Sequence, residues 1–383
     1  MQAPFAHTVL VVQRRLPHYR VPFFEALREQ LAEQNCLLRL AYGTPTPEER
    51  LKNDSADLPW AERLPTRYLL RGKICWQPFG RQLNGADLVV MTAENKLVYN
   101  LFVQFMHRKR VALWGHGANL QGRADSLRER FKRRVARKAD WWLAYTDMSV
   151  PLIERTGFPA ARITVLNNAI DTTELRGLRD AVTVERTAAL RAQLKLQGAH
   201  IGIYVGSLYA EKRIDFTLAA AAQIRKRIHD FEFVIVGGGP LQAEVTRFCE
   251  QHSWAKYVGV QKGQQKAALL ALATVMLNPG LVGLGILDSF VCGVPIFTTN
   301  CGLHSPEIAY LADGINGRMT ADSLSAYVDS VVEALSNESI LETLRRGSEA
   351  AGKEYTIERM AARFTAGVLA CLGAGPSVSV GSC

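Results

Sequence analysis

Short apolar runs alternate with helical segments along almost the whole 383-residue chain, and this alternation limits the possible folds more than any other feature. Strands separated by helices are typical of βαβ units, which build parallel sheets covered by helices. The strands predicted in the first half are residues 8–13, 36–42, 87–92, 110–114, 141–145 and 163–166. The second half adds strands at 201–205, 231–236, 257–260, 275–278 and 294–298. We therefore predict an α/β protein with two doubly wound parallel-sheet domains that face each other across a cleft.

The two series of strands also set the predicted domain boundaries. Residues 1–175 form the first domain, the polar helical stretch 176–199 a linker, and residues 200–355 the second domain. A helix over 356–372 is predicted to pack back towards the first domain, and the tail, residues 373–383, is predicted to be disordered. A chain of this length supplies a separate core for each domain.

The composition is that of a globular protein, with 48% hydrophobic and 21% charged residues. No apolar run approaches the roughly 20 residues that span a bilayer, and no signal peptide is evident at the N-terminus. The seven cysteines are odd in number and include no C-x-x-C pair, which argues against a disulfide framework or a zinc ribbon. We therefore expect a cytoplasmic protein.

Part of the net charge of +10 is concentrated between Arg123 and Lys138, where eight Lys/Arg stand against two acids. Leu127, Phe131 and Val135 recur every fourth residue there, which predicts a helix with an apolar stripe and a basic face. Such a helix is either a solvated surface helix or a patch that meets anionic lipid head groups or a phosphorylated acceptor. Nucleic acid is not an expected partner, because no aromatic-interleaved or helix-turn-helix pattern accompanies the charge.

A glycine-rich turn at 280–295 is the densest candidate binding feature. Gly280, Gly283 and Gly285 let the backbone pass close to a ligand. The helix predicted directly after them would offer free N–H groups to a phosphate or sugar oxygen, and it contains Asp288. The stretch fits a nucleotide-sugar site and fits equally well an ordinary turn between a helix and a strand.

Two further loops follow predicted strands of the second half. In one, Gly206 leaves room for a ligand, and Lys212 and Arg213 begin the next helix, where two fixed cations suit a diphosphate. The adjacent Glu211 is also compatible with a solvated helix start. The other loop runs into three glycines at 237–239, but it does not complete a G-x-G-x-x-G motif.

Other strand ends offer polar side chains. His116 stands between two glycines, where an imidazole would contact a sugar hydroxyl, although a lone histidine is more often structural. Asn167 and Asn168 fit a turn better than a substrate contact. Glu307 either stabilises a helix start or binds sugar hydroxyls. No H-E-x-x-H, G-x-S-x-G or P-loop motif occurs and no Asp/His cluster indicates a metal site, so we predict no metal and no cofactor.

Taken together and in this order, the loops resemble glycosyltransferase family 4 (glycosyl transferases group 1), which are retaining enzymes with the two-Rossmann GT-B fold. The resemblance covers roughly residues 8–365 and is most specific in the second half. The segments that resemble family motifs are 205–212 (G-R-L-x-x-E-K), 235–241 (V-G-x-G-P-L), 287–295 (L-E-A-M-A-C-G-x-P), 306–307 (P-E), 313–317 (D-G-x-N-G), 165–171 and 114–116.

The resemblance implies roles for individual residues. Lys212 would contact the donor diphosphate, Asp288 would stand where the second Glu of E-x₇-E binds ribose hydroxyls, and His116 would lie near the transferred sugar. The implied catalytic residues are His116, Lys212 and Arg213. The implied donor-binding residues are Gly206, Ser207, Lys212, Arg213, Gly237, Gly238, Gly283, Leu284, Gly285, Asp288 and Glu307.

Three positions depart from the family pattern. Gly280 stands at the first Glu of E-x₇-E, Ser207 at the usual Arg of the first loop, and Asp288 at the second Glu. Arg213, next to Lys212, would supply the missing cation.

The sequence thus predicts a metal-independent retaining glycosyltransferase that uses a UDP-sugar or GDP-sugar and a glycan or lipid-linked acceptor. Its expected role is the biosynthesis of a cell-surface polysaccharide such as lipopolysaccharide or exopolysaccharide. We expect it in the cytoplasm or on the inner face of the plasma membrane. Two alternatives remain: a non-catalytic sugar-nucleotide-binding or scaffold protein, and a nucleotide-dependent oxidoreductase built on residues 237–239.

Overall fold

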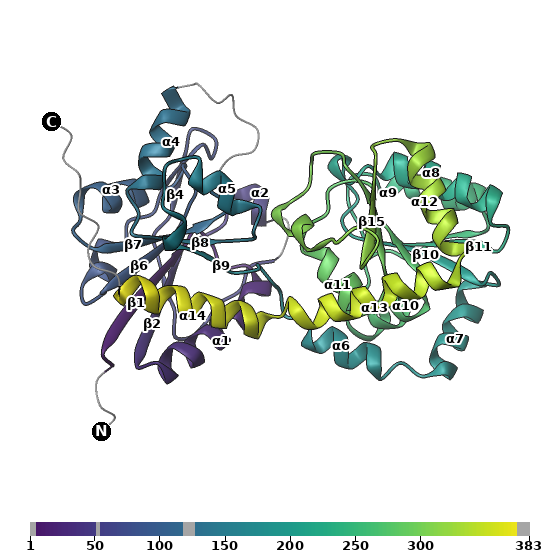
Figure 1. Ribbon diagram of the computed structural model, residues 1–383, viewed down its shortest axis with the longest axis horizontal. Coiled ribbons are helices and arrows are strands. Elements are labelled where there is room, and N and C mark those ends of the chain that lie inside the picture. Colours follow the sequence, from purple (N-terminus) through teal and green to yellow (C-terminus); the bar gives the residue numbers. More distant parts are fainter. Residues whose placement is uncertain (1–4, 51–53, 118–126, 374–383) are drawn as a thin grey trace. The chain divides into compact units, whose positions relative to one another are not determined.

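The computed structural model describes residues 5–50, 54–117 and 127–373. The chain divides into two compact units, one formed by Met1–Ile170 with Ile357–Cys383 and the other by Asp171–Thr356 (Figure 1). Each unit holds its own parallel sheet, in the strand order β3-β2-β1-β6-β7-β8-β9 in the first and β12-β11-β10-β13-β14-β15 in the second. The two predicted Rossmann-like parallel sheets are therefore confirmed.

The first unit forms its sheet from seven strands and carries a separate two-stranded hairpin. The sheet strands are β1 (His7–Gln13), β2 (Cys36–Tyr42), β3 (Glu62–Arg63), β6 (Leu88–Thr92), β7 (Arg110–Gly115), β8 (Trp141–Ala144) and β9 (Ile163–Val165), and the hairpin strands are β4 (Arg67–Leu69) and β5 (Ile74–Trp76). The helices are α1 (Val21–Glu33), α2 (Pro47–Arg50), α3 (Val98–Met106), α4 (Leu127–Arg137), α5 (Ser149–Glu154) and α14 (Ile357–Gly373).

An aromatic cluster fixes α14 in the first unit. Phe364 of α14 lies 5.2 Å from the ring of Trp114 on β7 and 5.6 Å from that of Phe23 on α1, measured between ring centroids. All three side chains are almost completely buried. Burying large aromatic side chains stabilises a core strongly, so the last described helix of the chain completes the core of the first unit, where it lies along α1 (Figure 1).

The second unit is a six-stranded parallel sheet with helices packed against it. Its strands are β10 (His200–Val205), β11 (Phe231–Val236), β12 (Ala255–Tyr257), β13 (Val275–Leu277), β14 (Ile296–Thr299) and β15 (Gly317–Thr320). Its helices are α6 (Thr173–Asp180), α7 (Val184–Leu194), α8 (Ile214–Arg227), α9 (Gln242–Gln251), α10 (Gly263–Leu272), α11 (Gly285–Val291), α12 (Leu324–Leu335) and α13 (Glu338–Glu354). The four central strands, β10, β11, β13 and β14, are largely apolar and buried, as expected for a parallel sheet covered by helices.

The structure differs from the sequence prediction at several elements, three of them in the second unit. The stretch 176–199, predicted as a linker, contains the end of α6 and all of α7, and both helices pack against α10 because apolar side chains such as Leu190 are buried there. Strand β15 has no apolar run and was not predicted; it forms by pairing in parallel with β14. The strand predicted at 257–260 lies at Ala255–Tyr257. Of the tail predicted at 373–383, Gly373 ends helix α14, and residues 374–383 lie outside the described residues.

Candidate active site

The candidate site lies at the carboxyl ends of the central strands of the second unit. The strand order reverses between β10 and β13, and parallel sheets bind ligands at such a point. Four loops leave the sheet there, at 206–213, 237–241, 278–284 and 300–305. All the predicted donor-binding residues lie on these loops or in the first turns of the helices that follow them.

The glycines at 237–239 join two loops of the site to each other. Gly237 has a φ of +148°, and a Cβ there would overlap the carbonyl oxygen of Gly206. Gly239 has a φ of +153°, and its Cβ would lie 2.5 Å from the carbonyl oxygen of Leu208, whose own N–H donates to Gly238 at 2.9 Å. These glycines are therefore needed for backbone packing between β10 and β11, whether or not a ligand approaches them.

Lys212 lies against the turn that contains Gly280. Its Nζ donates to the carbonyl oxygen of Leu281 at 2.6 Å, and the N–H of Leu281 donates to the carbonyl of Glu211 at 2.8 Å. A Cβ on Gly280 would lie 2.5 Å from the carbonyl carbon and oxygen of Lys212. Burial lowers the pKa of Lys212 from its ordinary 10.5 to about 8, because water is withdrawn from the ammonium.

The opposite side of the same turn is held by the loop after β14. The N–H of Val282 donates to Nδ1 of His304 at 3.1 Å, and the carbonyl of Val282 accepts from the N–H of Ser305 at 2.9 Å. Nε2 of His304 lies 2.7 Å from the carbonyl oxygen of Thr299. All four backbone groups of Leu281 and Val282 therefore have partners within the protein.

The backbone that follows is open. A Cβ on Gly285 would meet nothing within 4 Å, and the atoms nearest to a Cβ on Gly283 would be in the side chains of Ser305 and Leu281, 3.4 Å away or more. Helix α11 begins at Gly285, directly after Leu284. The first N–H groups of a helix have no partner within it, so this turn can accept an oxygen-rich ligand.

Arg213 has other partners than Lys212. Its backbone has a φ of +54°. The guanidinium forms an ion pair with Asp322, donates to Oγ1 of Thr299 at 3.2 Å and stacks over the ring of Phe216 at 4.5 Å. The positive charge of Arg213 is thus already matched by a carboxylate.

Asp288 is also paired. Its Oδ2 lies 2.7 Å from Nζ of Lys266 on α10, and both side chains are largely buried. Glu307, in the short 3₁₀ turn Pro306–Tyr310, is 4% exposed, whereas the side chain of Ser207 faces solvent. The two acids predicted to contact the donor therefore differ in access, because Glu307 lies beneath the surface and Asp288 at its edge.

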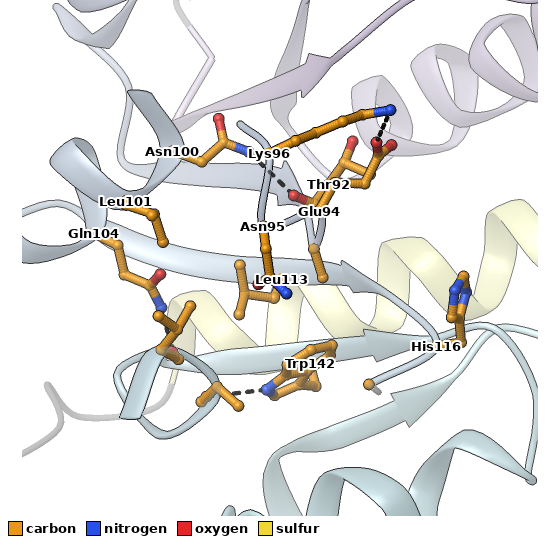
Figure 2. Close-up of a pocket in the computed structure, with 14 residues that line it drawn as sticks. Thr92, Glu94, Asn95, Lys96, Asn100, Leu101, Gln104, Leu113, His116 and Trp142 are labelled. Carbon is orange, nitrogen blue, oxygen red and sulfur yellow. Dashed lines mark hydrogen bonds and ion pairs between the residues drawn. The ribbon is translucent and has the colours of Figure 1, made fainter. Parts of the chain in front are cut away.

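His116 lies in the first unit, at the end of β7, and is exposed (Figure 2). It lines a cavity of about 310 Å³ with residues from β6, the loop after it, α3 and α4. Its lining mixes polar side chains, such as Glu94, Asn95 and Lys96, with apolar ones, such as Leu101, Leu113 and Trp142 (Figure 2). This cavity can hold a ligand that is partly polar and partly apolar.

The charges on the rim of this cavity are balanced. Glu94 pairs with Lys96 at 3.2 Å and with Arg14 at 3.3 Å, and Arg14 also forms a two-pronged pair with Glu49. Arg14 holds the pKa of Glu49 at about 2, well below its ordinary value. The carboxylate of Glu94 is therefore oriented by two cations.

The basic stretch predicted from Arg123 to Lys138 is described only in part, because residues 118–126 lie outside the described ranges. Helix α4 covers Leu127–Arg137. Phe131 is exposed, whereas Val135 is buried, so the predicted apolar stripe is only partly covered. Phe102 and Met106 of the neighbouring α3 are exposed as well, next to exposed cations. We call this the α3–α4 surface; it comprises Phe102, Met106, Arg108, Phe131, Arg134, Arg137 and Lys138.

Comparisons with known proteins identify the second unit. Residues 199–337 match the family model described as glycosyl transferases group 1. This part of the chain is therefore similar to group 1 glycosyltransferases. The matched range contains every predicted donor-binding residue, and the predicted family and GT-B fold are thereby confirmed.

The curated relatives and solved structures are distant. The α-D-kanosaminyltransferase of Streptomyces kanamyceticus is 26% identical over 50% of this chain and 48% of its own. The GDP-mannose-dependent α-(1-6)-phosphatidylinositol monomannoside mannosyltransferase of Mycolicibacterium smegmatis is 27% identical over 42% of this chain and 43% of its own. The chain thus spans about half the length of the curated relatives it matches. The structure of Anabaena HepE in complex with UDP has a TM-score of 0.68 at 14% identity and covers 94% of this chain and 99% of that one.

Sequence reasoning located the loops of the candidate site but missed two of its side chains. Lys266 was not considered, because it lies inside a predicted helix and only the fold brings it to Asp288. His304 lies three residues before Glu307, and its position after a strand was the available signal. Within the described residues, no group of three or more His, Cys, Asp or Glu is placed to hold a metal ion.

The close approach at Gly280 yields a prediction. Gly280→Ala should lower the free energy of unfolding by about 1–3 kcal/mol, because the new Cβ must push the backbone of Lys212 away. Gly280→Glu, which restores the family residue, should lower stability at least as much and should not increase activity. Urea unfolding measures the change, with Gly285→Ala, where there is open space, as the matched control. A stable and more active Gly280→Glu variant would contradict the assignment.

Proposed function

We propose that the protein is a retaining glycosyltransferase that moves a sugar from a nucleoside diphosphate sugar to a glycan or lipid-linked saccharide. The observation that carries this proposal is the position of Lys212 beside the open turn Gly283–Gly285, at the point where the sheet order reverses. An ammonium and free backbone N–H groups are the donors that a diphosphate requires. The family match covers this same region.

The names of similar proteins support a UDP-sugar or GDP-sugar as donor. Anabaena HepE is seen with UDP, and the Mycolicibacterium relative is named for GDP-mannose and for a phosphatidylinositol monomannoside. The second name also supports a lipid-linked acceptor. We place the reaction in the synthesis of a cell-surface polysaccharide, such as lipopolysaccharide or exopolysaccharide.

The proposed chemistry uses fixed charges and needs neither metal nor cofactor. Departure of the sugar leaves negative charge on the diphosphate, which Lys212 and the N–H groups of Gly283–Gly285 would stabilise. A phosphate oxygen that binds Lys212 would replace the carbonyl oxygen of Leu281 as the acceptor of the hydrogen bond from Nζ. Asp288 would accept from the ribose hydroxyls, and His116 would contact the acceptor side of the reaction.

The geometry disfavours the oxidoreductase alternative. The glycines at 237–239 on which it rests are engaged in backbone packing with Gly206 and Leu208. A non-catalytic scaffold is a second candidate. Gly280 stands where the family pattern has a glutamate, and Arg213 is paired with Asp322 and so has no unmatched charge for a diphosphate. Turnover separates this candidate from the enzyme.

The test is incubation with UDP-, GDP- and ADP-sugars and detection of the released nucleoside diphosphate. We expect one class of donor to be consumed and to raise the melting temperature by mass action. EDTA should leave the rate nearly unchanged, since the proposed charge stabilisation comes from side chains and backbone. Binding without turnover would favour the scaffold, and loss of activity with EDTA that Mg²⁺ or Mn²⁺ restores would contradict the metal-independent mechanism.

The lowered pKa of Lys212 predicts how donor binding depends on pH. The ammonium is the form that binds a diphosphate, so nucleotide affinity should fall as the pH rises through about 8. Lys212→Met should weaken binding by roughly 10- to 100-fold at pH 7, the effect of one charge-assisted hydrogen bond, and should remove this alkaline limb. Isothermal titration between pH 6.5 and 9.5 measures both effects.

Two matched variants accompany this titration. Arg213→Met should weaken binding less than Lys212→Met does, because Asp322 already neutralises the guanidinium. Lys262→Met removes an exposed lysine of the same unit and should change nothing. An unchanged alkaline limb in Lys212→Met would mean that the diphosphate binds elsewhere.

We further propose that the protein acts on the cytoplasmic side of the plasma membrane, to which the α3–α4 surface attaches it peripherally. Phe102, Met106 and Phe131 can enter the head-group region while Arg134 and Lys138 meet anionic lipid. None of the described helices is long and apolar enough to cross a membrane.

Vesicle co-sedimentation checks the attachment. Binding to vesicles with anionic lipid should be weak at 0.1 M salt and should fall further at 0.5 M, because the Debye length shortens from about 10 Å. The triple variant Phe102→Ser, Met106→Ser, Phe131→Ser should reduce binding severalfold. Val184→Ser, an exposed apolar residue of the second unit, serves as control. Equal recovery under all conditions would show that the α3–α4 surface is only solvated.

A further inference from the structure

His304 connects two loops of the second unit through both nitrogens of its ring. Nδ1 accepts from the N–H of Val282 at 3.1 Å, and Nε2 lies 2.7 Å from the carbonyl oxygen of Thr299. A carbonyl can only accept, so Nε2 carries the proton, and a backbone N–H can only donate, so Nδ1 does not. The contacts therefore select the neutral imidazole in one tautomer.

Val282, whose N–H donates to His304, is the last residue before the open turn whose backbone groups both have partners within the protein. The carbonyl of Val282 accepts from Ser305, and Leu281 is held by Glu211 and Lys212. Gly283, Leu284 and Gly285 follow directly and carry the N–H groups proposed to meet the donor. The direction of these N–H groups depends on where Val282 is held, because one misplaced peptide rotates those after it.

We propose that His304 is a positioning residue, which in its neutral form holds the backbone of Val282 so that Gly283–Gly285 present their N–H groups to the donor. This inference rests on the proposed function of the glycine turn. It assigns to His304 no contact with the substrate itself.

The surroundings of His304 favour the neutral form. The charged and titratable groups near it are Lys212 and the Cys301 thiol, which lies 3.7 Å from Nε2. The guanidinium of Arg213, paired with Asp322, lies near that thiol. Burial and the charge of Lys212 both lower the pKa of His304 below its ordinary 6.5. Protonation would place an N–H on Nδ1 against the N–H of Val282 and break the contact, so donor use should fall as the pH drops through that lowered pKa.

The experiment compares His304→Phe, which keeps a ring but loses both contacts, with His304→Asn, whose amide oxygen can still accept from Val282. We expect His304→Phe to lower kcat/KM for the donor about tenfold or more, His304→Asn to recover part of the loss, and both to lack the acid limb of the wild-type profile. Hydrogen exchange of the peptide that contains Val282 should be faster in His304→Phe. His229→Asn, an exposed histidine before β11, is the control for all three measurements.

The outcomes separate this inference from the function on which it rests. A wild-type protein that binds no nucleotide sugar overturns the proposed function and the positioning role with it. If the wild type consumes the donor, unchanged donor kinetics or an unchanged acid limb in His304→Phe overturns the inference alone. A loss of thermal stability in His304→Phe without these changes also overturns it, because His304 would then serve only the fold.

Discussion

The contact between the backbone of Gly280 and the carbonyls of Glu211 and Lys212 is the constraint on which the rest of the candidate site depends. Because no side chain separates the two loops, the N–H of Leu281 reaches Glu211, and the ammonium of Lys212 reaches the carbonyl of Leu281. The turn is then fixed from one side, and His304 and Ser305 fix it from the other. The conformation of Gly283–Gly285 follows from these contacts.

The same packing leaves the cations around the turn with partners of their own. Lys212 donates to a carbonyl, Arg213 pairs with Asp322 and Lys266 pairs with Asp288. Of these, Lys212 gives up the least when an anion arrives, because a carbonyl oxygen carries only a partial charge. A diphosphate that replaced this carbonyl would give the buried ammonium of Lys212 the negative partner that it lacks. At Arg213, the diphosphate would instead have to compete with the carboxylate of Asp322.

The sequence was sufficient for the architecture and for the positions of the loops, because strands with buried faces and glycine turns leave local signals. The turn before α11 and Lys212 were both located in this way. Contacts between segments that are distant in the sequence leave no local pattern that could predict them. For this reason α7 was taken for a linker, β15 was missed and Lys266 was not connected with Asp288. Arg213 shows the same limit. Its position next to Lys212 in the sequence suggested that both side chains bind one ligand. In the structure, the backbone of Arg213 has a φ of +54° and its guanidinium pairs with Asp322.

Gly280 also bears on how a donor sugar could be recognised. The family resemblance implies a carboxylate at this position, yet the carbonyls of Glu211 and Lys212 occupy the space that its Cβ would need. Carbonyl oxygens accept hydrogen bonds from sugar hydroxyls as a carboxylate does, but without a full charge, and those of Glu211 and Leu281 are already engaged. Under the proposed function, the N–H groups of the turn would then donate to hydroxyl oxygens of the sugar. In that proposal, a glycine in place of the acid would leave a sugar subsite that offers hydrogen-bond donors rather than a carboxylate acceptor.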